Sequence, residues 1–246
     1  MSQPTLILGT RGSELALTQT TMVTQALQTA HPHLKIERQI IQTSGDKRQD
    51  LRFSEFSDVA QVDKGIFIKE LEMALEKGEI HAAVHSLKDM PSDLAAGFQI
   101  AAVLPRAPIE DVLITREACT LETLPQGARV GTSSVRRAAQ LKWLRPDVEI
   151  VEIRGNVPTR VKKVLGELPL DAVMLAAAGL LRLGLMSGDR IEIEGQTIHA
   201  LTLDPVTFLP AAGQGAIAIE CRAGDAESYA LLRALNHAET ETRVIA

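Results

Sequence analysis

The sequence predicts an α/β protein built as two lobes. Short apolar segments of strand character alternate with longer segments whose apolar residues recur at helical spacing. A Gly-Thr pair closely followed by a serine occurs twice, at residues 9–13 and 131–134, each time between a predicted strand and a predicted helix. With 246 residues and 45% hydrophobic content, the chain can bury one large core or two ordinary ones. The repeated turn favours two.

The first predicted lobe begins as a strand, a helix and a second strand. Its helix follows Ser13, a good N-cap residue. After a polar stretch at 44–63, the spacing of Ile66, Ile68, Leu71 and Leu75 predicts another helix. The strands of this lobe are expected at 5–9, 34–43, 80–85 and 98–104, and the first helix at 13–30.

The second predicted lobe repeats the alternation, with strands at 111–115, 129–131, 148–153 and 171–176 and with helices beginning near Ser134 and Asn156. Late in the chain, a glycine turn at Gly213 feeds a buried strand that ends near Cys221 and is expected to join the first lobe. The connections near 104–110 and 200–209 then form a pair of hinges. The expected division is 1–104 with 206–225 as lobe 1, 105–205 as lobe 2, and a C-terminal helix within 226–246.

Composition argues against nucleic acid as a partner. The chain has 26 basic and 31 acidic residues, and only 3% of its residues are aromatic, so neither a general polyanion surface nor a base-stacking platform is indicated. The apolar run at 172–181 is too short to span a membrane, and the first 30 residues lack a signal-peptide pattern, which predicts a cytoplasmic protein. Cys119 and Cys221 are read as small hydrophobes, without a disulfide.

Arginines gather where predicted strands turn into helices. Residues 129–163 hold nine basic and three acidic residues. A guanidinium pairs bidentately with a carboxylate or phosphate, and the first turn of a capped helix adds backbone N–H donors. We therefore interpret Arg136, Arg137 and Arg154, which lie at the turns, as ligands for a small anion with several charges. Those deeper in the helices, namely Arg145, Lys162 and Lys163, are interpreted as a solvated basic face.

Asp89 is the candidate catalytic carboxylate. The run from Val84 to Pro91 delivers it to a loop at the carboxyl end of a buried strand, where open α/β sheets carry their sites. An ionised aspartate there can stabilise a developing cation or move a proton, and capping a turn is an equally acceptable role. His81 and His85 lie four residues apart in a strand, about 13 Å, which disfavours a shared metal. No metal site is predicted.

Seven motifs then follow one another along nearly the whole chain. They are Gly9-Thr10-Arg11-x-Ser13-x-Leu15-Ala16, Lys64-Gly65-x-Phe67-x-Lys69-Glu70-Leu71, Val84-His85-Ser86-x-Lys88-Asp89-x-Pro91, Gly131-Thr132-Ser133-Ser134-x-Arg136-Arg137, Arg154-Gly155-Asn156-x-x-Thr159-Arg160, Ala178-Gly179-Leu180-x-Arg182-Leu183-Gly184 and Pro210-x-x-Gly213-Gln214-Gly215. Together they closely resemble the porphobilinogen deaminase family, whose members are also called hydroxymethylbilane synthases.

The resemblance implies two lobes like those of a type II periplasmic binding protein, with the active site in the cleft between them. It also implies a transferase of porphyrin and heme biosynthesis, which joins four porphobilinogen units head to tail with loss of ammonia. Asp89 matches the family's essential carboxylate, which stabilises the azafulvene cation formed as the amine departs. Positions that match binding residues for the carboxylated pyrroles are Arg11, Ser13, Lys64, Ser86, Lys88, Thr132, Ser133, Ser134, Arg136, Arg137, Arg154, Arg160, Arg182 and Gln214.

The family's dipyrromethane primer is the expected cofactor, and porphobilinogen and linear pyrrole chains are the expected partners. Family members attach the primer to a cysteine of a third domain, and the present sequence ends at Ala246, where that domain would begin. We therefore expect a primer held noncovalently. Two alternatives stay open at this point: a truncated, inactive enzyme, and a pyrrole-binding protein without turnover. The oligomeric state is not predicted.

Overall fold

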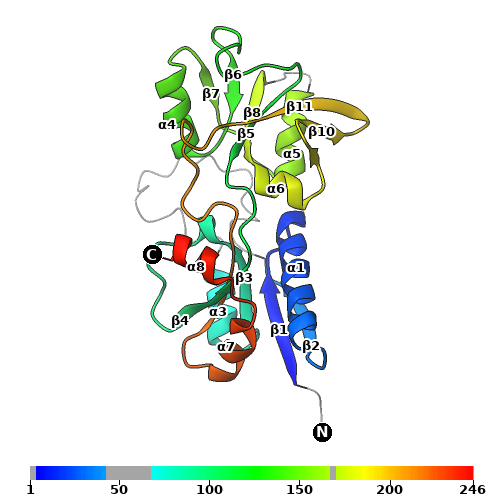
Figure 1. The fold of residues 1–246 in the computed structure, drawn as a ribbon, viewed down its shortest axis with the longest axis vertical. Coiled ribbons are helices and arrows are strands. Elements are labelled where there is room, and N and C mark those ends of the chain that lie inside the picture. The colour runs from blue at the N-terminus through cyan, green and yellow to red at the C-terminus, as the bar shows by residue number, and fades with distance from the viewer. Residues whose placement is uncertain (1–3, 43–67, 167–169, 246) are drawn as a thin grey trace. The chain divides into compact units, whose positions relative to one another are not determined.

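The computed structural model describes residues 4–42, 68–166 and 170–245, and these fold as two compact units. Unit 1 consists of Met1–Arg106 and Ala216–Ala246, and unit 2 of Ala107–Gly215. Figure 1 shows the chain passing from unit 1 into unit 2 and back, so that red C-terminal helices lie with blue N-terminal strands. Each unit has its own sheet and its own core.

Unit 1 is built on a five-stranded mixed sheet in the order β2-β1-β3-β12-β4. The strand that returns from unit 2 enters between two earlier strands and runs antiparallel to both. The strands are β1 (Thr5–Thr10), β2 (Lys35–Ile40), β3 (Ala82–Ser86), β4 (Phe98–Val103) and β12 (Ile217–Arg222). The helices are α1 (Glu14–Ala30), α3 (Lys69–Glu76), α7 (Ala226–Arg233) and α8 (Ala238–Val244).

Helices cover both faces of the unit 1 sheet. Val23 and Leu27 of α1 pack with Leu232 of α7 against one face. The other face carries α3, whose Leu71 and Leu75 pack on the neighbouring strands. The alternation of the strand side chains between these two clusters is the pattern expected for a sheet buried on both sides.

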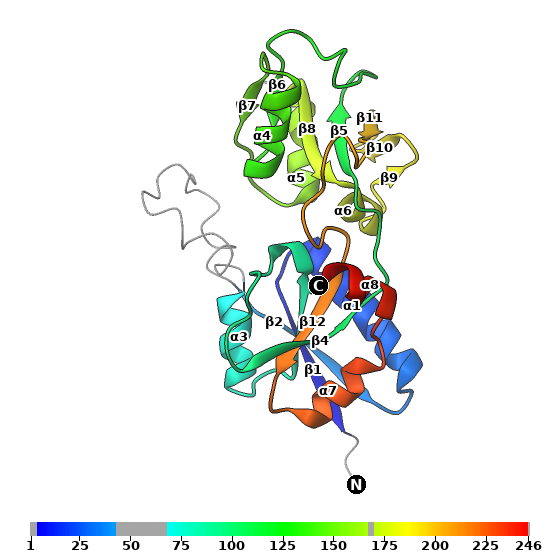
Figure 2. The ribbon, with the colours of Figure 1, turned by 60° about the vertical axis from the view of Figure 1, so that its left-hand side comes forward.

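Unit 2 has a seven-stranded mixed sheet in the order β7-β6-β8-β5-β11-β10-β9. Its strands are β5 (Asp111–Thr115), β6 (Arg129–Gly131), β7 (Glu149–Val151), β8 (Ala172–Ala176), β9 (Met186–Ser187), β10 (Arg190–Ile193) and β11 (Gln196–Thr202). Its helices are α4 (Val135–Leu144), α5 (Val157–Val161) and α6 (Ala177–Arg182). Leu141 of α4 packs on one face of β8 with Met174, and Val161 of α5 packs on the other with Val173. Figure 2 shows α4 and α5 beside β8.

Three predicted helix starts are confirmed by their caps. The side chain of Ser13 accepts a hydrogen bond from the Ala16 N–H, Ser134 accepts from Arg137, and Asn156 accepts from Thr159. Each cap satisfies a backbone donor that the first turn would otherwise leave without a partner. The repeated Gly-Thr turn has a packing reason as well. A Cβ atom at Gly9 would meet Ile80 at 2.3 Å, and one at Gly131 would meet Leu170 at 2.5 Å.

The structure differs from the sequence-based expectation at the unit boundaries. Residues 206–215 belong to unit 2 rather than to lobe 1. Phe208 is buried in the core of unit 2, and Leu209 accepts hydrogen bonds from α4, which holds this segment there. The segment 226–246 forms two helices, α7 and α8, and both pack on unit 1 as part of it.

Two further elements were not expected from the sequence. The hairpin of β10 and β11, with β9 beside it, extends the unit 2 sheet at one edge. The short helix α6 directly follows β8, and it places Arg182 in its last turn. In the described ranges, no helix is both long and apolar enough to cross a membrane.

Candidate functional site

Asp89 stands at the carboxyl end of β3, as predicted. The strand ends at Ser86 and passes into a single 3-10 turn, η2 (Leu87–Asp89). The Leu87 N–H donates to the carbonyl of Ala216 at 3.1 Å, and the Met90 N–H closes the turn on Leu87 at 3.0 Å. The buried Met90 side chain anchors the far end. The turn therefore holds the Asp89 side chain at the surface, where it is exposed.

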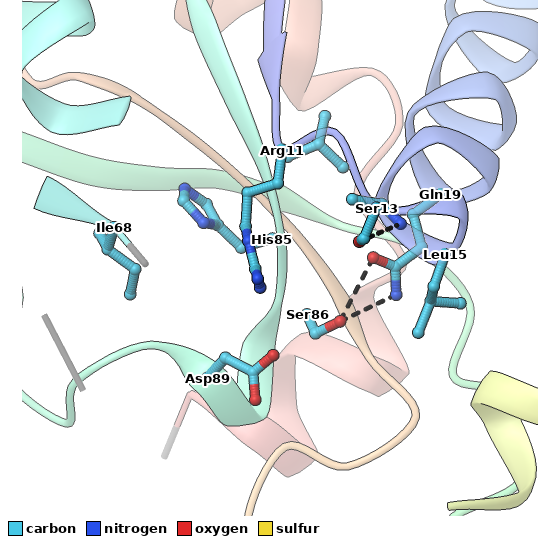
Figure 3. Close-up of a pocket in the computed structure, with 10 residues that line it drawn as sticks. Arg11, Ser13, Leu15, Gln19, Ile68, His85, Ser86 and Asp89 are labelled. Atoms are coloured by element: carbon cyan, nitrogen blue, oxygen red, sulfur yellow. Dashed lines mark hydrogen bonds between the residues drawn. The ribbon is translucent and has the colours of Figure 1, made fainter. Parts of the chain in front are cut away.

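A small pocket of about 70 Å³ brings four predicted site residues together. Arg11, Ser13, Ser86 and Asp89 all line it (Figure 3), and they come from the β1–α1 turn and from the end of β3. The apolar part of its wall consists of Leu15, Ala16, Ile68 and Val84. The pocket thus combines a carboxylate, a guanidinium and hydroxyls beside an apolar surface.

Gln19 is a pocket residue that the sequence-based reasoning missed. Its side-chain amide forms a reciprocal pair with Ser86: Nε2 donates to the hydroxyl at 2.9 Å, and the hydroxyl lies 3.2 Å from Oε1 (Figure 3). Gln19 is buried on α1 together with Thr20, Val23 and Leu27. A glutamine on the buried stripe of an amphipathic helix was the available signal, because buried polar groups need partners.

His85, which lines the same pocket, belongs to a buried imidazole–carboxylate pair. His85 Nε2 is 3.0 Å from Oε2 of Glu220, and Glu220 is 0% exposed. The two side chains share one face of neighbouring strands, since Glu220 lies opposite Ala83. Burial, and next the charge of Glu220, raise the pKa of Glu72 on α3. His81 has a different partner, because its Nδ1 accepts from the Ile7 N–H at 3.0 Å.

In unit 2, the Thr132–Ser134 turn is held by hydrogen bonds between its side-chain hydroxyls and backbone groups. The Thr132 hydroxyl accepts from the Ser134 N–H at 3.1 Å, the Ser133 hydroxyl donates to the Ile153 carbonyl, and Ser134 caps α4. Ser133 and Ser134 are half-buried, and Thr132 is buried. These contacts fix the turn from which α4 presents its two arginines.

Arg136 and Arg137 meet at a buried carboxylate that the sequence did not single out, Asp111 at the start of β5. Arg137 donates to its Oδ1 through Nε at 3.0 Å and Nη2 at 2.7 Å, and Arg136 Nη2 lies 2.7 Å from Oδ2. Gln214 donates to Oδ1 at 3.0 Å. Burial alone would raise the pKa of Asp111, but Arg137, Gln214 and Arg136 outweigh it and hold that pKa below its usual value.

Arg154 and Arg160 follow β7, and both are half-buried. Arg154 reaches Oε1 of Glu152 through Nε at 3.2 Å and through Nη2 at 3.1 Å. Arg160 donates to the Gly155 carbonyl at 2.7 Å, within its own turn. Arg154 therefore lies in the turn that follows β7, as predicted, and Arg160 of α5 reaches back to the same turn.

In the described parts of the chain, few groups balance the positive charge of Arg182. Its Nη2 donates to the Gly215 carbonyl at 2.7 Å, whereas its Nε is buried without a hydrogen-bond partner there. Burial lowers the pKa of Arg182 to about 10. No carboxylate of the described ranges pairs with it. A guanidinium in this condition is suited to receive an anion.

The structure does not unite all the predicted residues. Lys88 lies on η2 but does not line the pocket, and Lys64 lies outside the described residues, as do Ile66 and the polar stretch at 44–63. Neither cysteine lines the pocket. Cys221 is buried in the core of unit 1, where burial raises the pKa of its thiol to about 11, and Cys119 packs on a core cluster of unit 2.

Comparison with known proteins gives a family match over most of the chain. The model of "Porphobilinogen deaminase, dipyromethane cofactor binding domain" matches residues 6–230. The chain is 45% identical over 241 residues to porphobilinogen deaminase of Shouchella clausii, which covers 98% of this chain and 73% of that protein. It is 47% identical over 232 residues to porphobilinogen deaminase of a Roseiflexus species, which covers 94% of this chain and 71% of that protein.

Solved structures share the fold at much lower identity. The effector binding domain of BenM, solved with benzoate, has a TM-score of 0.54 at 14% identity and covers 94% of this chain and 90% of that chain. The periplasmic VFT2 domain of Bordetella pertussis BvgS has a TM-score of 0.53 at 16% identity and covers 98% and 92%. This likeness concerns the fold alone, and it confirms the predicted two-lobe α/β class.

Proposed function

The chain belongs to the porphobilinogen deaminase family, and from this premise we propose that Asp89 is its catalytic carboxylate. Enzymes of this family are transferases of tetrapyrrole biosynthesis, and the chain is an enzyme of this kind. They join porphobilinogen units head to tail with loss of ammonia and release the linear product hydroxymethylbilane.

Binding is the first task, because every porphobilinogen carries an acetate and a propionate and a growing chain is a polyanion. We assign the carboxylates to arginines, since a guanidinium can bind a carboxylate through two parallel hydrogen bonds. Arg11 does this in unit 1, beside Asp89 in the same pocket. The assigned arginines of unit 2 are Arg136, Arg154, Arg160 and Arg182.

The dipyrromethane primer carries the same two kinds of carboxylate, and the condition of Arg182 supports its fit. An incoming carboxylate would give the buried Nε of Arg182 its missing partner and would compensate the desolvated charge. Arg136 would contribute a second cation. When bound, the dipyrromethane supplies the pyrrole carbon at which the chain of units begins.

Within these 246 residues we propose that ion pairs, rather than a thioether, hold the primer. Cys221 is 0% exposed, and the raised pKa of its thiol disfavours the thiolate that such a bond needs. Cys119 is half-buried against Leu121 and its neighbours in a separate core cluster. Neither cysteine lines the pocket that contains Asp89.

The chemical role of Asp89 follows from the charge that develops on the substrate. When the aminomethyl group of porphobilinogen leaves as ammonia, positive charge spreads over the pyrrole ring and its N–H. An ionised carboxylate that accepts a hydrogen bond from this N–H stabilises the cation more than it stabilises the neutral ring. Arg11 binds the negatively charged side chains of the substrate, and the Gln19–Ser86 pair keeps one wall of the pocket in a single arrangement.

One observation carries this assignment: an exposed carboxylate shares a pocket with a guanidinium and with hydroxyls. A protein that only bound polyanions would gain nothing from a carboxylate at that place, because Asp89 would repel the ligand. A protein that reads the pyrrole N–H has a use for it. This favours turnover over simple binding.

The experiment is a turnover assay of the 246-residue chain with porphobilinogen, in which ammonia and acid-oxidised porphyrin are followed. It is run with and without preformed hydroxymethylbilane as a source of primer. We expect product, and we expect its rate to rise when bilane is added. Porphobilinogen that binds without ammonia release in both conditions would contradict the assignment and favour a pyrrole-binding protein. A cytoplasmic location and the absence of a nucleic-acid partner remain predictions from the sequence.

A further inference from the structure

Asp111 holds the two adjacent arginines of α4 in different ways. The Asp111 side chain is 0% exposed, and its Oδ1 accepts two hydrogen bonds from Arg137. Arg137 also donates through Nη1 to the Met174 carbonyl at 3.1 Å, and it is only 6% exposed. The Arg137 guanidinium is thus buried and bound on several sides. We conclude that its charge chiefly balances Asp111.

Arg136 remains more open. It meets Asp111 through one ion pair, Nη2 to Oδ2 at 2.7 Å, and its Nη1 donates to the Leu209 carbonyl. A quarter of its side chain is exposed. A guanidinium has five N–H donors, and these two contacts leave others for an incoming carboxylate. Of the two neighbouring arginines, Arg136 is therefore the better placed to bind an anion.

Gln214 explains why the two carboxylate oxygens differ. Its Nε2 donates to Oδ1 at 3.0 Å and to the Ile109 carbonyl at 2.6 Å, and the residue is fully buried. Oδ1 therefore receives three donors, two from Arg137 and one from Gln214, while Oδ2 is left to Arg136. The next residue, Gly215, has φ +86°, and a Cβ there would meet the Ala107 carbonyl oxygen at 2.4 Å, so the backbone around Gln214 is tightly constrained.

We propose that Asp111 is a positioning residue that holds Arg136 in place to bind a pyrrole carboxylate. Its Oδ1 pairs with the Arg137 guanidinium, and its Oδ2 pairs with Arg136. The proposal rests on the function proposed above, since the carboxylate belongs to porphobilinogen or to its linear products. Arg136 touches the ligand, and Asp111 acts through it.

The test is a double-mutant cycle of Asp111→Asn and Arg136→Gln, read as KM and kcat for porphobilinogen and as Kd by calorimetry. Arg136→Gln is expected to raise KM and Kd about tenfold, the scale of one charge-assisted hydrogen bond. Asp111→Asn should raise them similarly while kcat changes little, and it should add nothing once Arg136 is Gln. Additive effects would overturn the proposal. Asp147→Asn, which removes the charge of Asp147 from the partly exposed Arg145–Asp147 pair, is the matched control and should change neither value.

Asp111→Asn leaves two cations close together, so a second variant guards against a folding defect. Asp111→Asn combined with Arg137→Gln removes both buried charges at once and should fold. In it, Arg136 still lacks its counter-ion, and we expect the raised KM to persist. A KM equal to that of the unmodified chain would overturn the proposal.

A readout without substrate separates this proposal from the proposed function. We expect Asp111→Asn to speed the hydrogen exchange of the Arg136 guanidinium, measured by nitrogen-15 NMR. Faster exchange in a chain that neither binds nor converts porphobilinogen would support the positioning of Arg136 and reject the function. Unchanged exchange would reject the positioning, whatever the activity.

Discussion

Arg182 is a single residue whose buried charge favours anion binding and destabilises the protein when no anion is bound. Its buried Nε has no hydrogen-bond partner in the described ranges, and burial holds its pKa at about 10. A charge removed from water without a counter-ion destabilises the fold, whereas a bound carboxylate reverses that penalty. Stability and binding are therefore expected to change in opposite directions when this charge is removed.

We predict that Arg182→Gln weakens porphobilinogen binding by about tenfold or more while leaving Tm unchanged or higher in the absence of ligand. The reason is that glutamine is neutral and removes the desolvated charge. Calorimetric titration and thermal unfolding measure the two effects. Arg190→Gln is the control, because Arg190 is exposed and lies 3.9 Å from Asp189. A clearly lower Tm with unchanged affinity would show that Arg182 serves the fold instead.

The site residues differ in how far sequence could predict them. Asp89 could be predicted because it follows a buried strand, and Arg136 could be predicted because it lies in the first turn of a capped helix. Asp111 could not be predicted, since its partners lie 25, 26 and 103 positions away and its role depends on the sheet that brings them together. Gln19 was missed for the same reason: Ser86 is its partner only once α1 packs beside β3.

Among the elements, α8 fixes the end of β4 where the chain leaves unit 1. The Asn236 Oδ1 accepts from the buried Val103 N–H at 3.1 Å, and the His237 N–H donates to the Val103 carbonyl at 2.9 Å. Thr240 accepts from the Arg106 N–H at 3.1 Å. These contacts satisfy backbone groups that would otherwise end a strand without partners.

We predict that Asn236→Ala lowers the free energy of unfolding by about 1–3 kcal/mol, because it leaves the buried Val103 N–H without an acceptor. Urea unfolding measures the loss. Glu239→Ala, on the exposed side of the same helix, breaks only the Glu239–Arg243 pair and should cost no more than about 0.5 kcal/mol. Equal losses in the two variants would mean that α8 does not secure the end of β4.

Elements with a local signal could be predicted, and those without one could not. The starts of α1, α4 and α5 depend on a capping side chain within the first turn, so their positions were visible in the sequence. By contrast, the apolar run at 172–181 contains a strand and a helix without a break. The β10–β11 hairpin turns at Glu194 and Gly195, both with positive φ, and its short strands gave no long periodic pattern.

For the whole molecule, two features were predictable: the fold class, and the passage of the chain from unit 1 into unit 2 and back. Both depend on patterns that are local in sequence, namely the strand-helix alternation and the late glycine turn. The exact return point was not predictable. Residues 206–215 stay in unit 2 because Phe208 fills its core and Gln214 binds Asp111, which are contacts with residues far away in the chain. Each unit thereby carries part of the proposed machinery, the carboxylate in unit 1 and most of the assigned arginines in unit 2.

In the proposed division of roles, Asp89 performs the chemistry and the arginines perform the binding. The most direct measurement compares Asp89→Asn with the unmodified chain in two assays on the same preparation: ammonia release from porphobilinogen, and Kd for porphobilinogen by calorimetry. Asp93→Asn is the control, because Asp93 is exposed in the same loop and does not line the pocket.

We predict that Asp89→Asn slows ammonia release by about 100-fold or more and leaves Kd unchanged, since the shape of the side chain is kept and only the charge opposite the substrate cation is lost. Asp93→Asn should alter neither quantity. Ammonia release at the rate of the unmodified chain, or a loss of binding as large as the loss of turnover, would contradict the account.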